Sequence, residues 1–213
     1  MRKALLSLGF LLGLSAPAWA QVPCIGVGGV NSVPQVGISC AQEPTVTTYA
    51  ATGVGIVPAA SATDIACIAG AAGKVIRLQQ IRISGSGTAI SVPVLIRKNA
   101  SLDTGGTLGT GTVLPVAYAL DSANAAASAV LASYTANPTV NDAAPGIIDN
   151  ANLGVVATTV GSATSFINFD YYTRFYAQAP LLRKATEQIC VNLNATSPTA
   201  LLNVTFKWTE AAQ

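Results

Sequence analysis

The sequence contains no histidine in its 213 residues. Histidine is the side chain that most often acts as a general base near neutral pH, and it completes the Ser–His and Cys–His nucleophile systems. It is also the commonest ligand for protein-bound metals. Its absence removes the usual routes to hydrolytic and transition-metal chemistry. We therefore expect no catalytic residue, no bound cofactor and no enzymatic activity.

Charged side chains are also scarce, at 9% of the chain compared with about a quarter in an average globular domain. The nine carboxylates show no spacing that nominates a catalytic pair, and no serine stands three residues before a lysine. Calcium is the most credible metal, because oxygen ligands suffice for it. Its loop candidates are Asp103, Asp142, Asp149 and Asn150. They lack EF-hand spacing, so we expect solvated turn residues there.

What the chain does have is an N-terminal pattern typical of secretory signals. A basic start at Met1–Lys3 precedes an apolar run over residues 4–14, and Ala18 and Ala20 occupy the two positions that determine cleavage. Pro17 interrupts this run well before the roughly 20 apolar residues that a spanning helix needs. We expect residues 1–20 to be removed, no membrane span in the mature chain, and an extracellular, cell-surface or periplasmic location.

Cleavage changes the charge of the chain. Loss of Arg2 and Lys3 lowers the basic residues from eleven to nine, which balances the nine acidic residues. The densest basic stretch, Lys74, Arg77 and Arg82, is interleaved with apolar residues and is typical of the wet face of a strand. Proteins that bind nucleic acid usually show a basic patch or stripe. We expect no nucleic-acid partner.

Four cysteines follow the signal: Cys24, Cys40, Cys67 and Cys190. An even number in an exported chain indicates two disulfides, with three conceivable connectivities. We favour Cys24–Cys40, which closes a short N-terminal loop, and Cys67–Cys190, which joins two predicted strands. Zinc is the alternative, but there is neither a Cys-x-x-Cys pair nor a histidine.

Two-residue alternation of apolar and polar side chains dominates after residue 44. It is clearest at 76–83, 90–97, 189–193 and 202–208, and each of these segments reads as a half-buried strand. Further strands are predicted at 45–51, 63–69, 113–120, 129–135, 154–159, 165–172 and 181–183. Turns are predicted at 70–73, 85–87, 103–111, 137–138 and 141–146, and a single helical turn at 123–129.

Two local features refine this pattern. Ile76 and Leu78 are apolar at even positions and Ile81 at an odd one, so an extra residue is indicated. We predict a β-bulge at Gln79–Gln80. Pro93 lies within a strand pattern, which places it at a sheet edge or on the unpaired side of its strand.

These segments predict a single domain over 45–213, preceded by an irregular arm at 21–44 that Cys24 and Cys40 pin. The length is enough for one sizeable core. About ten short strands with these turn spacings favour an all-β fold, an antiparallel β-sandwich or jelly roll.

Aromatic residues concentrate at 166–176. We favour a core strand, because aromatics are typical of buried strands. The alternative is a binding surface for a glycan or a protein, with Tyr172, Arg174 and Tyr176 as the exposed members.

Three segments, GIVPAASATDI at 55–65, SYTANPT at 133–139 and FKWTE at 206–210, resemble small, mostly uncharacterised β-rich proteins of tailed phages and prophages. The resemblance covers 45–210. It implies a single β-sandwich module and a role as a virion surface or decoration component, with no chemistry attached to the motifs.

Together these patterns predict an exported, non-enzymatic structural or adhesive surface protein. We expect it to self-associate through sheet edges or its N-terminal arm, because unpaired strand backbone invites another strand. A virion decoration or fibre protein and a carbohydrate-binding module are the alternatives.

Overall fold

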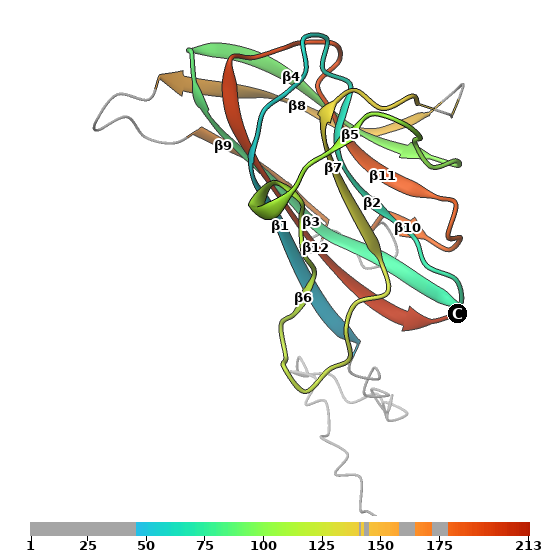
Figure 1. Cartoon of the computed structure of the whole chain (residues 1–213). Coiled ribbons are helices and arrows are strands. Elements are labelled where there is room, and N and C mark those ends of the chain that lie inside the picture. The colour runs from blue at the N-terminus through green and yellow to red at the C-terminus, as the bar shows by residue number, and fades with distance from the viewer. Residues whose placement is uncertain (1–45, 141, 143–144, 158–164, 172–178) are drawn as a thin grey trace, which may run out of the picture. The chain divides into compact units, whose positions relative to one another are not determined.

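The computed structural model describes residues 46–140, 142, 145–157, 165–171 and 179–213, which form an all-β fold, as predicted (Figure 1). Its strands are β1 (Thr47–Ile56), β2 (Asp64–Ala69), β3 (Lys74–Gly87), β4 (Ile90–Asn99), β5 (Thr107–Leu108), β6 (Tyr118–Ala119), β7 (Val130–Ala136), β8 (Gly146–Ala157), β9 (Ser165–Asp170), β10 (Leu181–Leu182), β11 (Gln188–Asn192) and β12 (Ala200–Ala212). One 3-10 turn, η1 (Gly111–Val113), lies between β5 and β6. None of these residues belongs to a helix that is long and apolar enough to cross a membrane.

The strands form one strongly curled, mixed sheet (Figure 1). Their order is β5-β7-β2-β11-β4-β8-β3-β12-β1-β6, and β9 and β10 also pair with β3. All the described pairings are antiparallel except the short contact between β3 and β8. The longest ladder joins β3 to β12, so residues near the C-terminus are central to the sheet.

The core is built from alternate residues of these strands. On β12, Leu202, Val204, Phe206 and Trp208 are all fully buried, which confirms the alternation predicted for this segment. The Trp208 ring stacks on Tyr49 of the neighbouring strand β1, with 5.7 Å between the ring centroids. Each large apolar side chain buried in this way stabilises the fold by about 1.5–3 kcal/mol.

The predicted bulge is present in β3. Lys207 lies opposite Gln80 and the next residue, Trp208, lies opposite Leu78, so Gln79 is the extra residue. The bulge keeps Leu78 and Ile81 on the core side although their positions differ in parity, and both are buried.

Pro93 lies in β4, which is between β11 and β8 and is not an edge strand. The pairing with β11 extends only to Leu95, whereas Pro93 is paired with Asn152 of β8. The sheet-edge form of the prediction is therefore wrong. Pro93 has a strand partner on one side only, which is the other form and suits a residue without an N–H.

Five segments differ from their prediction. The predicted turn at 85–87 is part of β3, because these residues pair with 200–202 of β12, and the predicted turn at 103–111 contains the short strand β5. Of 113–120, only Tyr118–Ala119 is a strand, since Pro115 lacks an N–H and the carbonyl of Val113 accepts a hydrogen bond from the Ser133 hydroxyl at 2.6 Å. β8 begins at Gly146, inside the predicted turn and well before residue 154. No helical turn forms at 123–129, because the amides of Ser128 and Ala129 are bound by the Glu210 carboxylate.

The described residues belong to one compact unit, Val46–Gln213. The predicted signal, the arm at 21–44 and the predicted Cys24–Cys40 bridge lie outside the described residues.

Candidate functional site

A disulfide lies on the outer face of the sheet, away from the main core. Cys67 of β2 and Cys190 of β11 are directly opposite each other in an antiparallel pair, with Cα atoms 4.1 Å apart and an S–S bond of 2.08 Å. The predicted Cys67–Cys190 pairing is thus present in the structure. Tyr134 of β7 forms a small buried cluster with both cysteines.

A bulge brings Asp64 to the same face as this disulfide. Val191 lies opposite Ala66, but the next residue, Asn192, lies opposite Asp64, so Ile65 is an extra residue in β2. Without the bulge, Asp64 and Cys67, three positions apart, would point to opposite faces. The bulge re-aims the carboxylate toward the cysteines.

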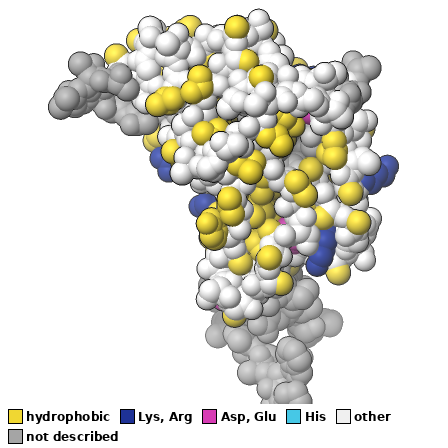
Figure 2. All heavy atoms as spheres, in the orientation of Figure 1, with side chains coloured by type: hydrophobic (Ala, Val, Ile, Leu, Met, Phe, Trp, Pro, Cys, Tyr) yellow, Lys and Arg dark blue, Asp and Glu magenta, His cyan; other side chains and the backbone are white. Residues whose placement is uncertain are grey.

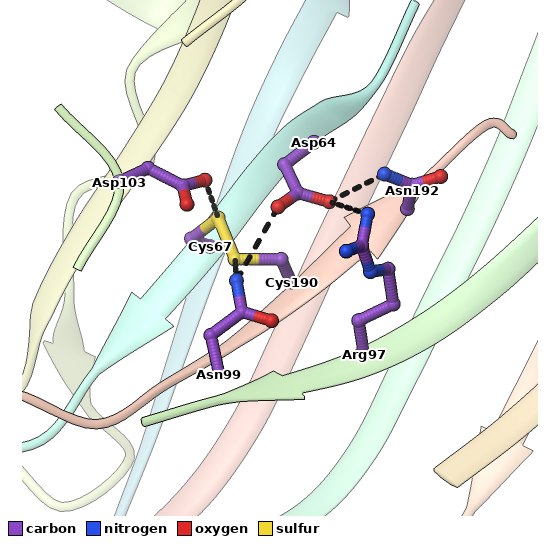
Figure 3. The surroundings of a disulfide bond; sticks show 7 residues. All are labelled: Asp64, Cys67, Arg97, Asn99, Asp103, Cys190 and Asn192. Atoms are coloured by element: carbon purple, nitrogen blue, oxygen red, sulfur yellow. Dashed lines mark hydrogen bonds and ion pairs between the residues drawn. A yellow bond between two sulfur atoms is a disulfide. The ribbon is translucent and has the colours of Figure 1, made fainter. Parts of the chain in front are cut away.

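Asp64 is fully buried and is held by side chains from two neighbouring strands (Figure 3). The Asn192 amide donates to Asp64 Oδ1 at 2.6 Å, and Arg97 Nη1 lies 3.8 Å from the same oxygen. The Asn99 amide donates a longer bond to Asp64 Oδ2 at 3.4 Å. These donors offset the large cost of burying a carboxylate, although the ion pair with Arg97 is long.

Asp103 reaches the cluster from the segment between β4 and β5. Its Oδ2 lies 3.9 Å from Cys67 Sγ, a contact and not a hydrogen bond, because a disulfide sulfur carries no proton (Figure 3). Burial, and then the charge and hydrogen bonding of Asp64, raise the pKa of Asp103 to about 7, against the opposing effects of Gln188 and Arg97. Asp103 therefore keeps its proton to a higher pH than an ordinary aspartate does.

The same burial and the same two carboxylates raise the pKa of Tyr134. One further polar atom of the cluster, Asn99 Oδ1, is buried and has no hydrogen-bond partner among the described residues. The Asn99 and Gln188 side chains are 0% and 3% exposed. Buried polar atoms without partners are costly, so this cluster carries unsatisfied binding capacity.

The segment that carries Asp103 is tied down at both ends. The amide of Ala100 donates to Asp142 Oδ2 at 2.7 Å, and Thr104 and Thr139 exchange backbone hydrogen bonds of 3.1 and 2.7 Å. β5 then pairs with β7. Asp103 is thereby held against the Cys67 side of the disulfide.

The calcium candidates do not assemble. Asp103 joins the disulfide cluster, Asp142 binds the Ala100 amide, and Asp149 Oδ1 accepts from the amide of Asn150. Asp149 and Asn150 lie within β8, so their prediction as loop residues is wrong. β8 extends that far because its residues 146–155 pair with β4.

Tyr172, Arg174 and Tyr176, the predicted binding surface, lie outside the described residues. Within the preceding strand β9, Phe169 is buried, whereas Phe166 is 54% exposed. The Arg82 guanidinium carbon lies over the Phe166 ring, 4.5 Å from the ring centroid. The aromatic segment therefore contributes side chains both to the core and to the surface.

Sequence reasoning missed Asp64, Asn99, Gln188 and Asn192 as members of a cluster. Gln188 and Asn192 were expected on a wet face, but both are buried, because they belong to the cluster around the disulfide. A signal was present: Cys190 lies between them at two-residue spacing, and a disulfide-bonded cysteine is usually buried. Its neighbours on the same face share that environment.

A second region of interest is the edge of β1. A groove of about 450 Å³ is lined by Ala50, Ala51, Thr52, Val54, Gly111, Thr112, Leu114, Val116 and Tyr118; we call it the β1 groove. Val54, Val116 and Tyr118 are 46%, 53% and 69% exposed. In Figure 2, apolar side chains gather on the face that holds β1, η1 and β6, and charged side chains are sparse there.

The structure thus defines an all-β protein with a curled mixed sheet, a buried cross-strand disulfide and an apolar groove along β1. No protein-family model matches the chain, and no curated protein or solved structure is significantly similar to it.

Proposed function

We propose that this protein is an exported, non-enzymatic structural or adhesive surface protein whose copies associate along the open edge of β1. The observation that carries the proposal is the β1 groove: β1 is covered on its outer side only by the two-residue strand β6, and exposed apolar residues without charge flank the rest of that side.

The backbone of β1 is only partly paired on its outer side. β12 covers the inner side from Thr47 to Ile56, whereas β6 pairs with Tyr49 and Ala50 alone. Among the described residues, no strand pairs with 51–56 on the outer side. Unpaired strand backbone is a template for a further strand, and natural edges are usually protected by charges or bulges. Charge protection is absent from the lining of this groove.

A second copy supplies the matching strand. Antiparallel pairing of β1 with β1 of another copy is self-complementary and closes as a twofold dimer. Such pairing places Val54 and Tyr118 of both copies in one apolar contact, and burial of that surface contributes about 25 cal/mol per Å².

The proposed architecture is a β-sandwich. One layer contains β1, β12 and β3, with β9 and β10. The other layer contains β7, β2, β11, β4 and β8. Side chains from both of these sets of strands share one apolar core, which supports two packed layers linked where β8 meets β3.

Two parts of the proposal, export and a non-enzymatic role, are supported by the disulfide and by the composition of the chain. A disulfide forms and persists in oxidising compartments, and the signal-like N-terminus supplies a route to one. With no histidine and few charges, the chain offers surfaces more readily than reactive groups.

The test is Val54→Lys, which puts a charge into the β1 groove. We expect at least a tenfold weaker self-association in sedimentation velocity, because a buried, unpaired lysine is costly. Leu201→Lys is the matched control: Leu201 is 52% exposed but lies on β12, between β3 and β1. Equal association of both variants and the parent protein would remove the β1 edge from the proposal.

The N-terminal arm is the other predicted contact. Residues 21–42 carry no charged side chain. Val33→Lys tests this segment: weaker association with Val33→Lys than with Val54→Lys would move the contact from the β1 edge to the arm.

A virion decoration or fibre role would use the same self-association, and the neighbouring genes would distinguish it from a secreted surface protein. A carbohydrate-binding role is tested by a glycan array of the full-length protein and of its Tyr172→Ala, Arg174→Ala and Tyr176→Ala variants. Absence of any glycan signal would eliminate it.

A further inference from the structure

We propose that reduction of the Cys67–Cys190 disulfide creates a site for a thiophilic divalent cation, for which Zn²⁺ is the best match, held by Asp64, Cys67, Asp103 and Cys190. This inference is independent of the proposed self-association. It assigns a redox-gated metal site to residues that are far apart in the sequence.

The geometry suits a small tetrahedral ion. One ligand atom from each of the four residues lies within 4.8 Å of every other (Figure 3). Two ligands of a tetrahedral zinc ion, at about 2.0–2.3 Å from it, are separated by about 3.3–3.8 Å, so the most distant pair must approach by about 1 Å. Small side-chain shifts after the S–S bond opens are therefore enough to enclose an ion.

The charges also favour a cation. The reduced cluster contains two carboxyl groups and two thiols, and the nearest described cation, the Arg97 guanidinium, lies 3.8 Å from Asp64. Two thiolates select zinc or another thiophilic ion over calcium or magnesium, which prefer a larger set of oxygen ligands.

Side chains that can hydrogen-bond to the four proposed ligands are already in place. The Asn99 amide contacts both Asp64 Oδ2, at 3.4 Å, and Cys190 Sγ, at 4.0 Å, and its own Oδ1 is buried without a partner. Gln188 is also buried, and its side chain hydrogen-bonds to Asp103. Amides that hydrogen-bond to ligating carboxylates and thiolates orient them and tune their affinity for a metal. The buried Asn99 amide, with its unpartnered oxygen, is the second, independent sign of a ligand at the cluster.

The redox step balances with a dithiol as reductant. Two electrons and two protons pass to the Cys67–Cys190 bond, which becomes two thiols while the dithiol closes to its own disulfide. Binding of the ion then displaces both thiol protons to solvent. Both sulfurs are buried, so attack on them requires local opening of the segment that carries Asp103.

The experiment uses the full-length chain with Cys24→Ser and Cys40→Ser, so that only Cys67 and Cys190 supply thiols. A phosphine reduces the disulfide, taking up oxygen from water to become a phosphine oxide, and is removed under anaerobic conditions. Co²⁺ is then titrated as a spectroscopic probe. We expect one equivalent to bind with thiolate-to-cobalt charge-transfer absorption, and Zn²⁺ to displace it.

Four further measurements identify the ligands of the metal ion. The oxidised protein should give no charge-transfer band. Asp103→Asn should weaken Co²⁺ binding at least tenfold, whereas Asp121→Asn, an exposed carboxylate at the end of β6, should leave it unchanged. Asp64→Asn should weaken binding at least as much as Asp103→Asn.

Two free thiols without a cobalt–thiolate band would overturn the site, and so would a band that is indifferent to both aspartate substitutions. If the reduced chain unfolds, Zn²⁺ should restore its strand circular dichroism, because metal binding free energy becomes folding free energy. Failure of Zn²⁺ to do so would equally contradict the inference.

Discussion

At the scale of single residues, the cluster around Cys190 brings two carboxyl groups, Asp64 and Asp103, together beside a buried disulfide. Asp64 is neutralised in part by Arg97 and two amides, whereas Asp103 meets a second carboxylate and a nonpolar disulfide. Buried carboxyl groups of this kind respond to pH in a predictable direction.

The pKa of Asp103 is raised from 3.8 to about 7. The folded state therefore keeps its proton at pH values where the unfolded chain has lost it, so this carboxyl destabilises the fold progressively as pH rises from about 4 to about 7. Asp103→Asn should remove this decline, which we expect to be on the order of 1–2 kcal/mol after allowance for solvent screening at a partly exposed group.

The predicted fall in stability with rising pH is measured by urea unfolding of the parent protein and of Asp103→Asn at a series of pH values. Glu187 acts in the opposite direction: hydrogen bonds from the Arg183 and Lys184 amides and nearby lysines outweigh its burial and lower its pKa. The difference between the two curves therefore isolates Asp103. A difference that does not change with pH would contradict the assignment.

The disulfide joins residues 123 positions apart. Cys67→Ala together with Cys190→Ala should lower the free energy of unfolding by about 3–5 kcal/mol, because a long loop is no longer closed in the unfolded chain. The urea midpoint reports the loss. Cys24→Ser with Cys40→Ser, outside the unit Val46–Gln213, should leave this midpoint in place.

At the scale of the elements, strand β12 is anchored by a carboxylate. Glu210 Oε1 accepts from the amide of Ala129 at 3.0 Å and from Trp208 Nε1 at 2.9 Å, and Oε2 accepts from the amide of Ser128 at 2.9 Å. These bonds tie the segment before β7 to the end of β12, and they explain why 123–129 is not helical.

Glu210→Gln replaces an acceptor oxygen by an amide that faces backbone donors. We expect a loss of about 2–4 kcal/mol, since hydrogen bonds to a buried charge are strong and the donors lose their partner. Thermal unfolding followed by Trp208 fluorescence measures it. Asp121→Asn, at an exposed carboxylate that accepts a hydrogen bond from the nearby Ala123 amide, should change stability by less than about 1 kcal/mol. Similar effects of the two substitutions would contradict the anchor.

The strands that the sequence predicts best are those whose neighbours are other strands. Alternation identified β12, and a change of parity identified the bulge at Gln79, because period-two patterns report directly on burial. The strand predicted over 113–120 is mostly absent. The Val113 carbonyl bonds to the Ser133 side chain, and the apolar residues of the segment line the β1 groove. The bulge at Ile65 was not visible: Asp64–Ala69 is buried on both faces and shows no alternation. The Asp64–Asp103 pair joins residues on separate elements, which no local pattern reports.

At the scale of the whole molecule, the chain presents surfaces with little charge. The β1 groove combines unpaired backbone with exposed Val54, Val116 and Tyr118, and nothing in the described residues protects this edge with a charge. A strand edge of this kind either pairs with a defined partner or favours aggregation. In the proposed twofold dimer, β1 of a second copy covers the unpaired side of β1.

The most direct test is the molar mass of the purified full-length protein by sedimentation velocity over a wide range of concentrations. Pairing along β1 predicts a reversible rise from monomer to dimer, and loss of that rise on Val54→Lys. A monomer at every concentration would contradict self-association through the β1 edge, and with it the proposed role.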